Sequence, residues 1–454
     1  MARKYNKDMI LSGDLTRAIL ALSIPVILNS LLQTMYNLTD TFWLGKIGTD
    51  HMAAITLVSP IQSIVVNFGS GITAAGAILI SQYVGAKDEE NANRMANQLF
   101  MCAMIFSVVC ALACALATPT IVHWLGARGD VYKYGKTYLQ IVIMDMPFLF
   151  LINLFTAVNQ AQGDTVRPLL LNTVGIVLNM ILDPLFMVVM DWGVAGAALA
   201  TLIAKVPCAL VAFWSLSRMK NPIHIHLKHF RFEKQKIGQI IKIGLPTAIG
   251  SSTMQFGFLL MSKSVLAYGS IAVAAYGIGN RVNGLITTAS NAMGSATATI
   301  VGQNVGAKQY DRADKGYRLA RNMIVVFLFV GGLILSREVI AEPIVKIFSS
   351  DDEVVRLGVE FLTILAIYCW TNGIYNTTMG LFQGTGHTMI TMAVDASRLW
   401  IFRFVTLYIC QYLLDMGVQS IWYSVVISNA LSALVLYVLY RTQIWKRNNV
   451  QVEL

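Results

Sequence analysis

The first long apolar stretch of the chain carries polar side chains at regular helical spacing. Asn29, Gln33, Tyr36, Asn37 and Asp40 recur every three or four residues, so a helix would place them on one face. Such a stripe would face an aqueous cavity or a neighbouring helix rather than lipid. Because an ionisable side chain at membrane depth is costly and marks a functional site by default, Asp40 favours the cavity.

A second group of polar residues lies in later apolar stretches. Asn179 and Asp183 are four residues apart and share a helical face, and Asp183 precedes Pro184, which weakens the local backbone hydrogen bonding. Small residues before Thr201 allow close helix approach, and Thr156 could join the group. Carboxylates, an amide and hydroxyls are hard oxygen ligands. The cluster is therefore predicted to hold sodium or, since two nearby carboxylates disfavour double ionisation, a proton.

The elements that position these residues are long and apolar. Hydrophobic residues make up 56% of the 454-residue chain and charged residues 13%, about half the charged share of a soluble domain. A spanning helix needs roughly 20 apolar residues, and about twelve stretches qualify. We predict spans at 15–44, 52–84, 95–123, 134–158, 167–190, 194–217, 238–267, 271–301, 319–345, 357–383, 388–414 and 417–441. A soluble protein with a large helical core is excluded by their number and length.

The distribution of basic residues sets the expected topology. The net charge of +10 could suggest a nucleic-acid partner, but most of the 34 Lys and Arg fall in loops on one side when the N-terminus is placed inside. We therefore expect no nucleic acid, both termini in the cytoplasm, and a multi-pass protein of the plasma (inner) membrane. The six cysteines all lie in apolar stretches without a C-x-x-C pair, so no metal or disulfide site is expected from them. A monomer is expected.

The chain repeats itself at an offset of 221 residues. The matching segments are Leu22-Ser23-Ile24-Pro25 with Ile243-Gly244-Leu245-Pro246, Val84-Gly85-Ala86-Lys87 with Val305-Gly306-Ala307-Lys308, and Gln162-Gly163 with Gln383-Gly384. Duplication predicts an all-α membrane protein of two six-helix lobes in the same orientation around a central cavity. The predicted parts are an N-terminal lobe (1–217) with the cation site, a basic cytoplasmic linker (218–237), and a C-terminal lobe with a cytoplasmic tail (238–454).

The second half lacks the acidic cluster. At the repeat offset, Asp40 corresponds to Met261, Asn179 to Trp400 and Asp183 to Phe404. One half alone is therefore predicted to carry the ion site. Uncharged polar residues from both halves are candidates for lining the cavity and contacting substrate: Gln33, Tyr36, Asn37, Gln255, Asn280, Asn372 and Asn376.

Several segments, taken in order, resemble the multidrug and toxic compound extrusion (MATE) family. They are Asn37-Leu38-Thr39-Asp40-Thr41 with the preceding Pro25, the two Val-Gly-Ala-Lys loops, Gln160-Ala161-Gln162-Gly163-Asp164, Asn179-Met180-Ile181-Leu182-Asp183-Pro184, and Gly196-Ala197-Ala198-Leu199-Ala200-Thr201. The resemblance implies a cation site at Asp40, Asn179, Asp183 and Thr201, and a first helix that bends at Pro25 as the site loads.

The resemblance is closest to the DinF-like branch of that family. The NorM-like branch has acidic residues at the positions of Gln255 and Asn372. Three positions depart from the branch: Thr156 replaces a usual Asn, Gln160 a common Arg, and Lys205 a neutral residue. Lys205 lies one turn beyond Thr201. Its ammonium either pairs with Asp40 or Asp183, which would favour proton coupling, or snorkels or faces water in the cavity.

These features predict a cation-coupled antiporter that exports organic, cationic or amphipathic compounds by alternating access. The coupling ion, H⁺ or Na⁺, stays open, and no cofactor is expected. The alternative is a lipid-linked oligosaccharide flippase of the same superfamily, which the basic residues Lys205, Lys263 and Arg281 keep open. An enzyme is not expected, because the chain has no P-loop, no H-E-x-x-H and no nucleophile elbow.

Overall fold

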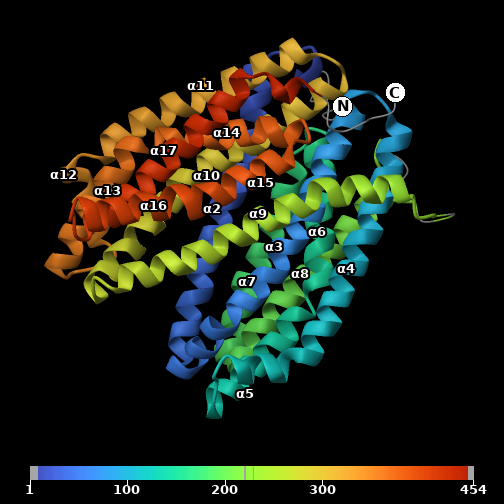
Figure 1. Cartoon of the computed structure of the whole chain (residues 1–454). Helices are drawn as coiled ribbons and strands as arrows, with labels where there is room; N and C mark the ends of the chain where they lie inside the picture. The colour runs from blue at the N-terminus through green and yellow to red at the C-terminus, as the bar shows by residue number, and fades with distance from the viewer. Residues whose placement is uncertain (1–8, 219–220, 227, 229, 448–454) are drawn as a thin grey trace. The chain divides into compact units, whose positions relative to one another are not determined.

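The computed structural model describes residues 9–218, 221–226, 228 and 230–447, and every regular element in this part of the chain is helical (Figure 1). The helices form two compact units, Pro25–Ala248 and Met1–Ile24 with Ile249–Leu454. Both limits fall inside long helices that contain proline, Pro25 in one and Pro246 in the other. The predicted division at 1–217, 218–237 and 238–454 follows the sequence repeat and stays a prediction.

The unit Pro25–Ala248 is built from helices that follow one another with short connections. They are α2 (Leu15–Ile47), which begins in the other unit, α3 (Thr49–Gly85), α4 (Glu89–Trp124), α5 (Gly129–Ile143), α6 (Met146–Ala161), α7 (Val166–Pro184), the π-helix η1 (Leu185–Val189), α8 (Gly193–Ser217) and the first half of α9 (Lys234–Leu266). Helix α3 packs against α4, α5 and α6, and α8 packs against α5, α6 and α7.

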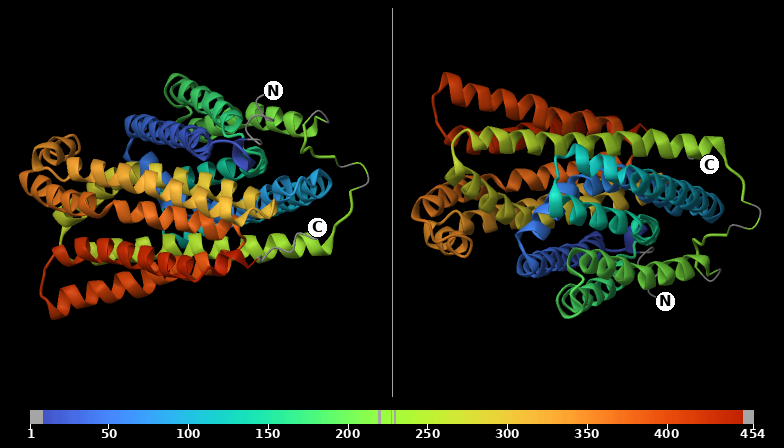
Figure 2. Two further views of the ribbon diagram at one scale, coloured as in Figure 1. Left: turned by 90° about the horizontal axis from the view of Figure 1, so that it is seen from above. Right: turned by 90° about the horizontal axis from the view of Figure 1, so that it is seen from below.

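The other unit repeats this order with more interruptions. It contains the rest of α9, α10 (Ser270–Gly306), α11 (Tyr310–Leu335), α12 (Glu338–Lys346), α13 (Asp352–Tyr368), α14 (Trp370–Gly384), α15 (Thr388–Ser397), η2 (Arg398–Arg403), α16 (Phe404–Tyr408), η3 (Ile409–Leu413), α17 (Gln419–Arg441) and η4 (Ile444–Lys446). Helices α10, α11 and α14 lie side by side, as the two views of Figure 2 also show.

All twelve predicted stretches are helical, but several of them are broken or interrupted. The stretch 134–158 is two helices, α5 and α6, bent by 43°, and 357–383 is α13 and α14, bent by 52°. The stretch 319–345 is wrong in its second part, since α11 ends at Leu335 and α12 follows as a separate short helix. The stretch 388–414 is interrupted by π-helices. Hydropathy measures how long an apolar segment is, and it does not detect where the helix within that segment breaks.

Seven of the described helices are long and apolar enough to cross a membrane, or nine if each bent pair counts as one span. Helices α9 and α10 and the interrupted segment from α15 to η3 are outside this set. Many small and polar residues in the middle of α9 and α10, and the short pieces of the last segment, account for the difference from twelve. The helices of the two halves still follow one another in corresponding order.

The duplication is visible in the backbone. Helices α2 and α9 each have 33 residues, and α3 and α10 each have 37. The two Val-Gly-Ala-Lys loops have the same conformation, with φ of 61° at Lys87 and 59° at Lys308. In each loop the residue after the lysine donates its backbone N–H to the carbonyl five residues earlier. Asp88 donates to Tyr83 at 3.0 Å, and Gln309 donates to Asn304 at 2.8 Å. Equal loop geometry at equal offset supports descent from one repeated unit.

Glycines allow α10 and α14 to approach each other very closely. A Cβ built on Gly380 of α14 would lie 2.1 Å from the carbonyl oxygen of Gly294 on α10, where no real Cβ fits. A Cβ on Gly294 would lie 2.6 Å from the Asn376 carbonyl oxygen. Small residues at helix crossings let the backbones approach closely. Inside lipid, where no hydrophobic effect drives helices together, the van der Waals packing of this close approach stabilises the contact.

We expect Gly380→Ala to lower the free energy of unfolding by about 1–3 kcal/mol, the usual cost of overpacking a close contact. The matched control is Gly331→Ala on α11, where a Cβ would meet nothing within 4 Å. That control is expected to be neutral or to stabilise by up to about 1 kcal/mol through helix propensity. Thermal unfolding of both variants in detergent is the measurement, and equal midpoints would contradict the close packing of α10 and α14.

Candidate cation and substrate site

The centre of the candidate site is a buried carboxylate and amide on α7. Asp183 is fully buried, and Asn179 donates from Nδ2 to Asp183 Oδ1 at 3.2 Å and to Thr201 Oγ1 on α8 at 3.4 Å. Helix α8 comes this near because Gly196 lies against η1: a Cβ there would be 2.7 Å from the Phe186 carbonyl. The regular α-helix ends at Pro184 and continues as the π-helix η1, as expected because proline has no backbone N–H to donate.

Two oxygens of this cluster have no hydrogen-bond partner among the described residues. They are Asp183 Oδ2 and Asn179 Oδ1, both buried. Buried polar atoms in folded proteins nearly always have a partner, so an orphaned pair needs an explanation. Two adjacent oxygen acceptors without a donor fit a hard cation or a proton, which are the ligands that such oxygens prefer. The sequence-based grouping of Asn179, Asp183 and Thr201 is therefore reproduced in space.

Asp40 approaches this cluster from α2. It is partly buried and close enough to Asp183 for the two carboxylates to interact electrostatically. Tyr36, one turn earlier on α2, interacts with Asp40, Asp183 and the Thr201 hydroxyl, and Tyr138 on α5 interacts with the same carboxylates. Four helices thus contribute to one ionisable cluster. Tyr138 was not singled out from the sequence, because a tyrosine in an apolar stretch has no distinguishing pattern.

A cavity of about 360 Å³ opens beside the cluster, lined by α2, α6, α7 and α8. Its polar lining includes Asn29, Gln33, Tyr36, Asn179, Thr201 and Lys205. The first half of the polar stripe on α2 therefore faces a cavity. Asn172 also lines the cavity and donates from Nδ2 to Asn29 Oδ1 at 3.0 Å, and Asn153 lines it from α6. Both asparagines were missed, although each is a polar residue inside an apolar stretch.

Other predicted residues lie outside this cavity. Asn37 accepts a hydrogen bond from Gln33 Nε2 at 3.4 Å, and Thr156 donates back to the Ile152 carbonyl of its own helix. Gln255, Asn280, Asn372 and Asn376 belong to the other unit. Asn376 donates to Ser290 Oγ on α10 at 3.0 Å, so it makes a helix–helix contact there.

Of the two alternatives for Lys205, pairing with Asp40 or Asp183 is not what the structure shows. The Lys205 ammonium forms an ion pair with Asp145, which is fully buried at the bend between α5 and α6. Asp145 lies inside the predicted span 134–158, so its charge at membrane depth was a signal that the sequence analysis did not use. Lys205 still lines the cavity, but its charge is directed to a third carboxylate and not to the Asp40–Asp183 pair.

The unit without the acidic cluster has a different polar network. Met261, which corresponds to Asp40, is fully buried in an apolar core. Asp395 accepts a hydrogen bond from the Tyr375 hydroxyl, while Arg398 stacks over the Tyr375 ring at 4.4 Å and donates to Asn429 Oδ1 at 3.0 Å. The network joins α14, α15, the start of η2 and α17, which suits a structural role in holding an interrupted helix.

Within the described residues, no group of three or more His, Cys, Asp or Glu side chains could hold a metal ion. The histidines of the basic linker have other contacts: the backbone N–H groups of His224 and His226 donate to Asn93 and Asn97 of α4. His229 lies outside the described residues.

Comparison with known proteins supports a single class. The MatE family model matches residues 25–185 and again 246–409, at the offset of the repeat. "Probable multidrug resistance protein YoeA" of Bacillus subtilis is 23% identical over 435 residues, covering 94% of this chain and 93% of that protein. "Multidrug export protein MepA" of Staphylococcus saprophyticus is 26% identical over 365 residues, or 80% of each.

A solved structure gives the same result for the fold. The outward-facing conformation of a multidrug resistance MATE family transporter of the MOP superfamily matches with a TM-score of 0.91 at 23% identity. The match covers 96% of this chain and 97% of that one. The predicted all-α membrane architecture is confirmed by this likeness.

Proposed function

Because the chain belongs to the MatE family of membrane transporters, we propose that it is a cation-coupled antiporter that exports organic compounds by alternating access. It is a transporter and not an enzyme. The observation that carries the proposal is the pair of buried oxygens without partners, Asp183 Oδ2 and Asn179 Oδ1, next to the second carboxylate Asp40. A coupling ion bound there would satisfy both acceptors and separate the two like charges.

The lining of the cavity supports organic cations or amphipathic compounds as substrates. Amide and phenol groups from Asn29, Gln33 and Tyr36 lie beside apolar side chains, and the nearest charges outside the Lys205–Asp145 pair are carboxylates. Curated relatives of this chain are named multidrug resistance and multidrug export proteins. A mainly apolar pocket with few polar groups can orient ligands of different shapes.

In the proposed cycle, Asp183, Asn179 and Thr201 bind the coupling ion, with Asp40 completing the site and Thr156 as a further oxygen on α6. Pro25 removes one backbone hydrogen bond from α2, so two helix shapes lie near one another in energy. Ion binding shifts this equilibrium only by its differential affinity for the two states. The bend would move Gln33 and Tyr36, which line the cavity, and thereby release substrate.

The corrected partner of Lys205 bears on the coupling ion. A lysine paired with Asp40 or Asp183 would have competed with sodium, but its charge is balanced by Asp145 instead. Sodium and the proton therefore remain equal candidates. The further expectations are a monomer of the DinF-like branch in the plasma membrane, with both termini cytoplasmic, no cofactor and no nucleic-acid partner. The terminal residues 1–8 and 448–454 lie outside the described residues.

The flippase alternative is not favoured. A phosphate-holding cavity needs several basic side chains, and the lining of the described cavity has Lys205 alone, which is paired with Asp145. Lys263 and Arg281 are exposed residues of the other unit.

We expect Asp40→Asn to abolish drug efflux from energised inverted vesicles while the wild type transports. The measurement is made with a proton gradient alone and then with a sodium gradient alone, and the gradient that supports wild-type transport identifies the ion. Asp50→Asn, which removes an exposed acidic residue in the first turn of α3, is the matched control and is expected to transport normally. Gradient-dependent efflux by Asp40→Asn at the wild-type rate would show that coupling occurs elsewhere.

A further inference from the structure

A second recess lies away from the acidic cluster, between α3, α4 and the first half of α9. It has a volume of about 240 Å³ and is lined almost entirely by apolar side chains, among them Phe68, Ile72, Cys102, Phe106 and Ile241. Phe68 and Ile241 are exposed, at 40% and 55%. A groove of this composition takes a hydrocarbon chain, and it lies wholly within one unit.

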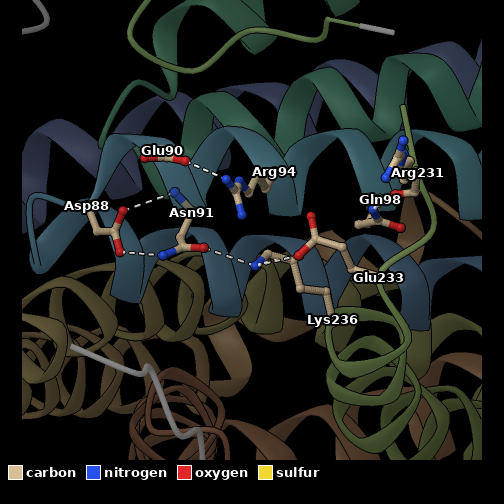
Figure 3. A network of polar contacts seen from close by, with 8 residues as sticks. All are labelled: Asp88, Glu90, Asn91, Arg94, Gln98, Arg231, Glu233 and Lys236. Carbon is tan, nitrogen blue, oxygen red and sulfur yellow. Dashed lines mark hydrogen bonds and ion pairs between the residues drawn. The ribbon is translucent and has the colours of Figure 1, made fainter. Parts of the chain in front are cut away.

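One face of helix α4 lines this groove and also contacts the basic residue Arg231. Gln98, Cys102 and Phe106 are four residues apart and share a face of α4. Gln98 is buried, and its Nε2 donates to the backbone carbonyl of Arg231 at 2.7 Å. The bond holds the backbone of Arg231 beside Gln98, one helical turn from Cys102 on α4. Figure 3 shows Gln98 and Arg231 next to each other.

Helix α9 leads to a second basic side chain at the same end. Lys234 is the first residue of α9, and Ile237, Ile241 and Leu245, which line the groove, follow it on the same face at spacings of three and four. Lys234 therefore stands about one turn, or roughly 5 Å, before the first apolar lining residue. The hydrogen bond from α4 and the start of α9 thus place Arg231 and Lys234 beyond the same end of the groove.

The surrounding charges leave these two cations unbalanced. In the network of Figure 3, Arg94 pairs with Glu90 at 2.6 Å and Lys236 with Glu233 at 3.0 Å. Arg231 and Lys234 are both exposed, and neither has a carboxylate partner in the part of the chain that the structure describes. Glu90 and Glu233 are thus already paired, whereas Arg231 and Lys234 keep an unbalanced positive charge.

We propose that this groove binds an anionic phospholipid, with an acyl chain along α3, α4 and α9 and the headgroup phosphate between Arg231 and Lys234. An acyl chain gains little by moving from bilayer to groove, because lipid tails are as apolar as the lining. Selectivity therefore comes from the charges, and basic pockets between membrane helices bind anionic headgroups in this way. The bound lipid would tie the start of α9 to α4 beside the linker.

The test is native mass spectrometry of the full-length protein, delipidated in detergent, with phosphatidylglycerol or phosphatidylcholine added. Wild type is expected to retain phosphatidylglycerol more tightly. Arg231→Gln and Lys234→Gln are each expected to weaken that retention about five-fold, which corresponds to ~1 kcal/mol per basic residue at a membrane surface. Neither variant should change phosphatidylcholine retention, and Lys234→Arg should restore the wild-type value.

The matched control is Lys315→Gln, which removes an exposed lysine from α11 in the other unit and should leave lipid retention unchanged. Ile241→Trp, which fills the groove from an exposed position, should release phosphatidylglycerol with both cations intact. Equal retention of the two lipids by wild type, or unchanged phosphatidylglycerol retention by the Arg231→Gln/Lys234→Gln double variant, would overturn the proposal. Neither result depends on transport activity.

Discussion

Lys205→Met is expected to lower the free energy of unfolding by about 3–5 kcal/mol, the cost of leaving one member of a buried ion pair alone. Asp145 is 0% exposed and its Oδ2 is paired with the Lys205 ammonium, while its Oδ1 has no partner in the described structure. Removal of the lysine therefore leaves a buried carboxylate without its counter-charge. Thermal or denaturant unfolding in detergent is the measurement.

The double variant Asp145→Asn/Lys205→Met is the decisive comparison. Replacement of both partners removes the buried charge, and such replacements are often neutral or stabilising, so most of the lost stability should return. Lys133→Met, at an exposed position of α5, is the matched control and is expected to unfold like the wild type. If the single Lys205 variant unfolded at the wild-type midpoint, the ion pair would be absent in solution.

The predictions that succeeded rest on short sequence distances. The stripe on α2 and the Asn179–Asp183 pair follow from helical periodicity, which fixes faces within a few turns whatever the tertiary structure is. The repeat was found from identity at a constant offset, and the equal lengths and loop conformations of both halves agree with it. A pattern that one helix or one loop determines by itself can be recovered from one sequence.

The predictions that failed required knowledge of where helices bend. The partner of Lys205 is 60 residues away in sequence, and Asp145 reaches it at the break between α5 and α6. Hydropathy predicts a single continuous span across this break, so the sequence did not indicate that Asp145 lies at a bend. Partners across helices depend on packing that periodicity does not encode.

Asp183→Asn is expected to reduce gradient-driven efflux to the level of vesicles without the protein. The change keeps the size of the side chain and an oxygen able to accept the Asn179 hydrogen bond, but it removes the negative charge on the fully buried group. A buried charge contributes little to stability and much to ion binding. The variant should therefore fold with a thermal midpoint at or above that of the wild type while losing coupled transport.

The matched control for this change is Asp191→Asn, an exposed aspartate just beyond η1, which is expected to transport normally. Substrate binding in the absence of a gradient separates two causes of lost transport. If Asp183→Asn binds substrate as the wild type does but no longer responds to H⁺ or Na⁺, Asp183 acts through the ion. If binding and gradient response both persist in Asp183→Asn, the unpartnered oxygens on α7 do not hold the coupling ion, and the acidic cluster has a structural role alone.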